Sequence, residues 1–508
     1  MRFRHLPAAA LALSLAGAAH AAAPPPRAAV KAWVNANQRA VLSDFLAFTA
    51  IPNVATTLPD VERNAAYIRA ELEKRGFTTR LLSAAPGTPP SVFAERRTAG
   101  AKRTMLFYAH YDGQPIGQKG WILKPFAPEV RTALPEAKRV DWRAAPALDP
   151  EWRVFGRGTG DDKLSIQAML SALDALKATS AKPSVNIKLL YEGEEEQGSP
   201  HFGTIVEQNA ALLKADALIM GDGPMHQSGR QILTFGNRGI VGFTATVYGP
   251  MKPLHDGHYG SFAPSPTVML AHLVARMRDE DGTIRIPGVL AGVAPVTAAD
   301  RAAIAAMPAN EAEVRRALGL GRSIGPARLP EGYLAPTLNV RAIHAGDDGP
   351  NAANAIATEG HASFDLRLAA GQKPEAVKRA VEDWLKAEGW TVVTATPDAA
   401  FRGANAKVLK LRWDEGASEA ARTPLDLPAA QAVIGSIART VGYQPILSPT
   451  SGGSSGIADA TKTLGTPMIG VSIANYDDNQ HAENENIRLG NLWEGIAVYA
   501  GLLSDLDW

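Results

Sequence analysis

The sequence predicts an α/β fold, with a mixed, mostly parallel sheet covered by helices on both faces and a smaller α+β layer inserted into it. In the first half of the chain, short apolar runs alternate with amphipathic stretches, which is typical of a parallel sheet with crossover helices. Near Arg238 the pattern changes to longer runs of alternating character, and the first pattern returns from about residue 400. The length of 508 residues also exceeds what one compact core usually holds.

The periodicity of apolar residues places the individual elements. Before the change of pattern we expect a helix at 60–75, a buried strand at 105–109, a helix at 164–177, a strand at 185–191, a helix at 204–214 and a strand at 217–220. In the insertion we expect strands at 239–248, 362–368 and 390–395, helices at 272–277 and 373–387, and loop or irregular helix between 281 and 350. A helix at 429–440, a strand at 468–472 and a helix at 492–503 complete the large layer.

The N-terminus has the pattern of a signal peptide. Arg2, Arg4 and His5 precede an apolar run that is too short to span a bilayer comfortably, and Ala19-His20-Ala21 offers a cleavage site between small residues. We therefore expect a periplasmic or secreted protein that is not membrane-bound after cleavage. The expected organisation is a signal peptide at 1–21, a large domain formed by 22–237 and 399–508, and an insertion at 238–398.

The composition narrows the possible partners and cofactors. The 52 Lys and Arg residues nearly balance the 51 Asp and Glu residues, so no overall positive field favours nucleic acid. The chain contains no cysteine, which excludes disulfides, a cysteine nucleophile and thiolate metal sites. Any metal must therefore be held by His, Asp and Glu.

Such side chains follow several of the predicted strands. His110 and Asp112 come after the strand at 105–109, Glu195 and Glu196 after that at 185–191, Asp222 after that at 217–220, and His481 after that at 468–472. Asp161 follows a glycine-rich loop and precedes a helix. Each residue alone is more typical of a structural or solvated position, but open α/β sheets bind ligands at the edge where these residues are expected to meet.

A set of two imidazoles and several carboxylates suits zinc, and manganese or cobalt less specifically. Two metals would need a carboxylate that bridges them. Asp112 lies two residues after His110, on the same face if the strand continues, and can orient its far ring nitrogen.

Seven segments in order give the chain a resemblance to the co-catalytic zinc exopeptidase family of carnosinase, cytosolic nonspecific dipeptidase, aminoacylase and bacterial glutamate carboxypeptidase. They are Tyr108-Ala-His-Tyr-Asp-Gly-Gln-Pro115, Gly156-Arg-Gly-Thr-Gly-Asp-Asp-Lys163, Glu192-Gly-Glu-Glu-Glu-Gln-Gly-Ser199, Gly221-Asp222, Leu254-His-Asp-Gly257, Ser363-Phe-Asp-Leu-Arg-Leu368 and His481-Ala-Glu-Asn-Glu485. Each is weak alone, but together they span nearly the whole mature chain.

The resemblance implies a di-metal peptidase that hydrolyses dipeptides or short peptides. It implies that His110, Asp161 and Asp222 hold one divalent metal and that Asp161, Glu196 and His481 hold the other, with zinc as the expected metal. It further implies that Glu195 is the general base on a metal-bridging water, and that the peptide bond between Asp161 and Asp162 is cis.

For the insertion, the resemblance implies a lid that also forms a homodimer. His255 would stabilise the oxyanion from the partner subunit, while Arg367, Asn354, Gly453 and Ser454 would bind the carboxylate end of the substrate. The chain departs from the family pattern at Leu164, where a glycine is usual, at Asp256, and before Gly452, where an arginine is frequent. These departures concern the choice of substrate rather than the metal chemistry.

Three alternatives remain open at this point. Within the same family, the chain could be an N-acyl amino acid amidohydrolase. The residues Gly452-Gly453-Ser454-Ser455-Gly456, followed by Asp477 and His481, formally fit a serine hydrolase, although Pro449 argues against a strand before them. A non-catalytic periplasmic solute-binding protein would also have a signal peptide and two domains, but it gives no reason for Glu195 beside a ligand acid.

Overall fold

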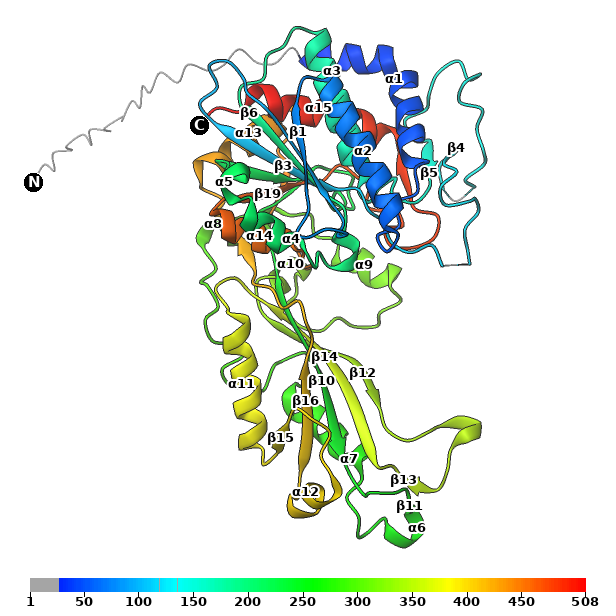
Figure 1. Ribbon diagram of the computed structural model, residues 1–508, viewed down its shortest axis with the longest axis vertical. Coiled ribbons are helices and arrows are strands. Elements are labelled where there is room, and N and C mark those ends of the chain that lie inside the picture. Colours follow the sequence, from blue (N-terminus) through cyan, green and yellow to red (C-terminus); the bar gives the residue numbers. More distant parts are fainter. Residues whose placement is uncertain (1–26, 118, 135) are drawn as a thin grey trace, which may run out of the picture.

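The computed structural model describes residues 27–117, 119–134 and 136–508, which form a large domain and a smaller elongated one (Figure 1). The predicted signal peptide at 1–21 lies outside the described residues. None of the described helices combines the length and the apolar character needed to cross a bilayer.

The large domain is built on an eight-stranded mixed sheet. Its strand order is β1-β2-β6-β3-β7-β19-β8-β18. The strands are β1 (Thr78–Leu82), β2 (Ser91–Arg96), β3 (Thr104–His110), β6 (Asn186–Glu192), β7 (Ala217–Met220), β8 (Ile232–Thr234), β18 (Ile446–Ser448) and β19 (Met468–Val471). The four central strands β6, β3, β7 and β19 are parallel, so their carboxyl ends share one edge.

Helices cover both faces of this sheet, as the sequence predicts. One face packs against α1 (Arg27–Thr49), α2 (Leu58–Lys74), α3 (Lys163–Ala178), α13 (Pro428–Val441) and α15 (Leu489–Asp505) in the largest apolar core. The other face packs against α4 (Phe202–Gln208), α5 (Ala210–Leu213) and α14 (Ile457–Leu464). Since both faces are buried, the central strands are apolar almost throughout.

The smaller domain has its own sheet and core. Its strand order is β12-β14-β10-β16-β15, formed by β10 (Gly239–Tyr248), β12 (Thr337–His344), β14 (Glu359–Leu368), β15 (Thr391–Val393) and β16 (Val408–Trp413). The helices α7 (Pro266–Met277) and α11 (Pro374–Ala387) contribute to the core of this sheet. At the end remote from the large domain lie β11 (Leu254–His255), α6 (Asp256–Tyr259) and β13 (Ala355–Ile356) (Figure 1).

Several short elements complete the two domains. A three-stranded sheet joins β4 (Glu129–Arg131), β5 (Arg153–Phe155) and β20 (Asn486–Arg488), and β9 (Gly236–Asn237) pairs with β17 (Ala421–Arg422). The remaining helices are α8 (Ala298–Ala306), α9 (Glu311–Ala317), α10 (Leu329–Gly332) and α12 (Ala399–Ala404).

The structure differs from the predicted elements at four points. The strand β16 pairs with β10, which extends the smaller sheet to Trp413, past the expected boundary at residue 398. The segment 281–350 contains the edge strand β12, and the first helix, α1, was not anticipated. The helix expected at 204–214 is two helices, because the chain turns at Asn209, whose side chain donates to the carbonyl of Ile205.

Candidate metal centre

The carboxyl edge of the parallel strands carries the predicted imidazole and acidic side chains. His110 is the last residue of β3, Asp222 follows β7, and His481 lies in the loop after β19. Asp161 comes from the loop between β5 and α3. Because ligands of open α/β sheets bind at this edge, the residues are placed where a site is expected.

Asp161 lies between the two histidines. Its Oδ1 is 2.8 Å from Nε2 of His110, and its Oδ2 is 3.1 Å from Nε2 of His481. The same nitrogen of His481 is 3.2 Å from Oε2 of Glu196. His110 and Asp161 are buried, whereas the side chain of His481 is 55% exposed. The carboxylate of Asp161 therefore has one oxygen facing each histidine, which is the arrangement a bridging ligand needs.

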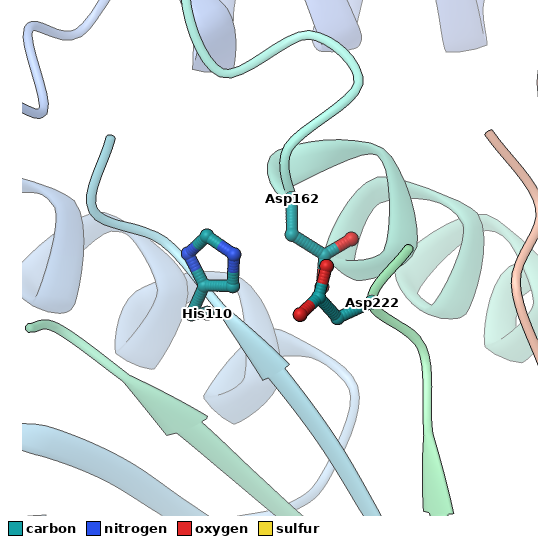
Figure 2. Close-up of side chains that lie close together, drawn as sticks. All are labelled: His110, Asp162 and Asp222. Carbon is teal, nitrogen blue, oxygen red and sulfur yellow. The ribbon is translucent and has the colours of Figure 1, made fainter. Parts of the chain in front are cut away.

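Two groups of side chains could each hold a metal ion. Within each group, the ligand atoms all lie within 4.8 Å of one another. Asp161, Glu196 and His481 form one group, as predicted. The other contains His110 and Asp222 together with Asp162, which is not among the predicted ligands. Figure 2 shows the ring of His110 facing the carboxylates of Asp162 and Asp222, which approach from the start of α3 and from the loop after β7.

Burial strongly affects the acids of this centre. It raises the pKa of Asp222 to about 6, and the charge of Asp161 adds to the effect. Burial also raises the pKa of Asp162 well above its ordinary value. Although burial opposes it, the neighbouring His110 holds the pKa of Asp161 below its ordinary range. Hydrogen bonds with Asp161 and Glu196 raise the pKa of His481 to about 10.

The donor set fits divalent cations. Several carboxylates cannot share a buried site in their charged forms unless protons or cations compensate them. The Oδ2 atom of Asp162 is buried and has no hydrogen-bond partner among the described residues. Imidazole nitrogens and carboxylate oxygens are ligands that zinc and related metals accept. Two neighbouring groups with Asp161 between them have the composition of a two-metal centre.

Asp112 connects His110 with the loop that carries the glutamates. Its Oδ1 lies 3.4 Å from Nδ1 of His110, which agrees with the predicted orienting role. The same carboxylate accepts the backbone N–H of Glu195 at 3.1 Å and that of Glu196 at 3.0 Å. Asp112 is fully buried, so one side chain fixes both a histidine and the two acids opposite it.

Two glutamines of the centre are not among the predicted site residues. Gln114 donates a hydrogen bond of 2.7 Å to Oε2 of Glu196, and Gln480 donates one of 2.8 Å to Oδ2 of Asp161. Gln114 belongs to a segment that carries the family resemblance, and its place four residues after His110 could have marked it as a site residue. Nothing in the sequence around Gln480 distinguishes it except that it precedes His481.

The predicted substrate-binding residues fall into two separate places. Arg367 on β14 donates a hydrogen bond of 3.0 Å to the hydroxyl of Ser454, which lies in the glycine-rich loop 452–456. The carbonyl of Gly453 accepts the backbone N–H of Arg238 at 2.9 Å. A Cβ atom at Gly456 would lie 2.6 Å from Cβ of Ser199, so this loop packs closely against the segment that follows Glu196.

His255 and Asn354 lie elsewhere, at the remote end of the smaller domain (Figure 1). They are neighbours because β11 pairs with β13, and the carbonyl of Asn354 accepts the backbone N–H of Asp256 at 3.1 Å. The side chain of His255 is 56% exposed. Within one chain, the structure therefore does not bring these two residues to the centre formed by His110 and Asp161.

The geometry does not support the serine hydrolase alternative. Five residues separate Ser454 from the end of β18, so no strand leads directly into it. The ring of His481 contacts Asp161 and Glu196. The peptide bond between Asp161 and Asp162 is cis, as the resemblance implies.

Comparisons with known proteins agree with this geometry. The family model described as peptidase family M20/M25/M40 matches residues 106–505. The Cys-Gly metallodipeptidase dug1 of Schizosaccharomyces pombe is 24% identical over 471 residues, which cover 90% of this chain and 91% of that protein. The Beta-Ala-His dipeptidase of Mus musculus is 24% identical over 427 residues, which cover 82% of this chain and 80% of that protein.

Solved structures with the same fold cover nearly the whole chain. The M20 family metallo-carboxypeptidase Sso-CP2 from Sulfolobus solfataricus has a TM-score of 0.74 and 26% identity, covering 92% of this chain and 98% of that one. The di-peptidase Dug1p from Saccharomyces cerevisiae has a TM-score of 0.72 and 21% identity, covering 94% of this chain and 98% of that one.

Proposed function

The chain belongs to peptidase family M20/M25/M40 and is a metallo-exopeptidase, and we propose that it hydrolyses the amide bond of dipeptides. The observation that carries the proposal is the position of Asp161, whose two oxygens face the imidazoles of His110 and His481. The choice of dipeptides is supported by relatives named as dipeptidases, which match most of the chain.

Two divalent metals, with zinc as the first candidate, are part of this proposal. His110, Asp162 and Asp222 would hold one, Glu196 and His481 the other, and Asp161 would bridge them. When bound, such a pair lowers the pKa of water and polarises the scissile carbonyl.

Glu195 is proposed as the general base. It begins the short 3-10 helix Glu195–Gln197, where the hydrogen bond from its own N–H to Asp112 fixes its backbone. Burial raises the pKa of Glu195 to about 9. Two bound cations would favour its charged form, which is the form that can accept a proton. It would accept a proton from the attacking water and deliver it to the leaving amine.

Arg367, Ser454 and Gly453 are proposed to bind the free carboxylate of the substrate. A guanidinium matches the geometry of a carboxylate, and the hydrogen bond to Ser454 holds that guanidinium in place. His255 and Asn354 would complete the pocket from the smaller domain of a second copy, where His255 would donate a hydrogen bond to the oxyanion. The proposal therefore includes a homodimer formed through the smaller domain.

Export to the periplasm or the medium is a further part of the proposal. It is supported by the pattern of residues 1–21.

Metal removal followed by a substrate screen tests the function. The purified protein is stripped with a chelator, metal content is measured, and zinc, manganese or cobalt is restored separately. Each form is assayed with dipeptides, tripeptides and N-acyl amino acids. We expect activity to disappear on stripping, to return with metal and to be highest on dipeptides. Turnover that persists in the metal-free protein would contradict the mechanism, and a preference for acylated amino acids would contradict the substrate class.

A further inference from the structure

The carboxylate of Glu485 is fully buried and is surrounded by hydrogen-bond donors. Its Oε1 accepts the backbone N–H groups of Gly160 at 2.8 Å and of Asp161 at 3.0 Å. Its Oε2 accepts the backbone N–H of Gly158 at 3.0 Å and Nη1 of Arg157 at 2.8 Å. The loop that carries Asp161 therefore curls around this single side chain.

Glycines allow the loop to take this course. Gly158 has a φ of +77°, in the left-handed region that favours glycine, and a Cβ atom there would lie 2.8 Å from Nδ2 of Asn53. A Cβ atom at Gly160 would lie 3.1 Å from Oδ2 of Asp478. Successive N–H groups that converge in this way form a concavity for an anion, and here the chain supplies the anion itself.

Glu485 also belongs to the loop that carries His481. It lies four residues after that histidine and directly before β20, which pairs with β5. Its own carbonyl accepts the backbone N–H of Gly156 at 2.9 Å. Main chain and side chain of one residue thus fasten the loop of Asp161 to the loop of His481.

The guanidinium of Arg157 completes the arrangement. It is 1% exposed, it forms the ion pair with Glu485, and it lies 5.2 Å from the ring centre of Trp121. A buried carboxylate would be costly without such a partner. The charge of Glu485 is therefore balanced by Arg157, while three of its four hydrogen bonds go to the backbone of the Asp161 loop.

We propose that Glu485 is a positioning residue that sets the separation between Asp161 and His481 and thereby the affinity of the centre for its metals. The inference rests on the proposed function, because it assigns Asp161 and His481 as ligands. Glu485 does not take part in the reaction itself. It acts by holding the backbone N–H of Asp161. This keeps the carboxylate of Asp161 at a fixed distance from the imidazole of His481.

The test is metal binding by two matched variants of the full chain. Glu485→Gln keeps the size of the side chain but replaces one acceptor oxygen with an NH2 group. Each oxygen of Glu485 accepts hydrogen bonds from two N–H donors, so the NH2 group would face two donors that it cannot pair with. Glu483→Gln makes the same change two residues earlier in the same loop. Metal-free wild type and both variants are titrated with Zn²⁺ alone by calorimetry, and circular dichroism and Tm report folding.

We expect Glu485→Gln to fold and to bind Zn²⁺ about 10- to 100-fold more weakly than wild type, as is typical when the support of a ligand is removed. Glu483→Gln is expected to bind as wild type does. Wild-type affinity in folded Glu485→Gln, or an equal loss in both variants, would overturn the proposal. A wild type that binds no Zn²⁺ would instead overturn the proposed function.

A second variant covers the case in which Glu485→Gln does not fold. Glu485→Asp keeps the charge that balances Arg157 but withdraws the carboxylate from the backbone N–H groups. It should fold and still bind Zn²⁺ about tenfold more weakly or worse. Wild-type affinity in this variant would overturn the proposal. Failure of both variants to fold would also overturn it, in favour of a purely structural role.

Discussion

The Nη1 atom of Arg367 donates a hydrogen bond of 3.0 Å to Oγ of Ser454. This contact joins a strand of the smaller domain to the glycine-rich loop of the large one. A second contact holds the same guanidinium, since its Nη2 lies 3.1 Å from Oδ2 of Asp365. Arg367 is thus fixed by both domains, and its side chain stays 25% exposed.

Arg367→Ala should weaken substrate binding more than it slows turnover. Loss of a charged hydrogen-bond donor costs about 1.5–3 kcal/mol, which corresponds to a KM about 10- to 100-fold higher. The effect should be confined to dipeptides with a free carboxylate, so the preference over dipeptide amides should disappear. Steady-state kinetics on both substrates provide the measurement. Arg412→Ala, at an exposed arginine of the same sheet, serves as the control.

If Arg367→Ala discriminates between dipeptides and dipeptide amides as well as wild type does, Arg367 does not bind the carboxylate of the substrate.

Glu195→Gln should abolish turnover without removing the metals. Glutamine has nearly the same shape but cannot accept and return a proton, so kcat should fall about 100- to 10,000-fold. Metal content, measured by mass spectrometry on the same sample, should equal that of wild type. Glu207→Gln, on the exposed side of α4, is the matched control and should retain full activity.

Undiminished turnover in Glu195→Gln would assign the proton transfer to another residue.

Asp161→Asn should affect metal content itself. The change removes the charge whose two oxygens lie beside His110 and His481, so fewer than two metals per chain should remain after dialysis. Asp174→Asn, at a partly exposed acid on α3, should keep the wild-type content. Elemental analysis of both proteins gives the comparison. Retention of two metals in Asp161→Asn would show that this carboxylate is not the shared ligand.

Much of the centre could be predicted because its residues follow strands closely. His110 ends a strand, and Asp222 comes two residues after one, so apolar runs of the right length fixed their positions along the sheet edge. Asp161 was predictable from the glycines before it and from the helix after it. In these cases the site residue lies within a few residues of a strand or helix that the local sequence pattern predicts.

Other features depend on contacts that local patterns do not encode. Asp162 joins His110 and Asp222, although its position at the start of α3 equally suits a simple helix cap. The strand β12 has an exposed outer half, so its apolar alternation is weak. Residues 408–413 fell within the range expected for the large domain, and no strand was predicted there; only the pairing of β16 with β10 places them in the smaller sheet.

The proposed homodimer predicts that mixing two inactive variants restores activity, because His255 lies at the remote end of the smaller domain while Glu195 lies in the large one. In a mixed dimer of Glu195→Gln and His255→Ala, one site combines an intact Glu195 with the partner's intact His255. The other site lacks both. After subunit exchange at equal amounts, half of the dimers are mixed, so about one quarter of wild-type activity should return.

The control mixture pairs Glu195→Gln with Arg367→Ala. Arg367 contacts Ser454 within its own chain, so it should serve the same site as Glu195 of that chain. Exchange then creates no site with both residues intact, and activity should not exceed that of the Arg367→Ala protein in the mixture. Recovery in this control, or no recovery in the His255→Ala mixture once exchange is verified by mass spectrometry, would exclude the proposed contribution of His255 from a second subunit.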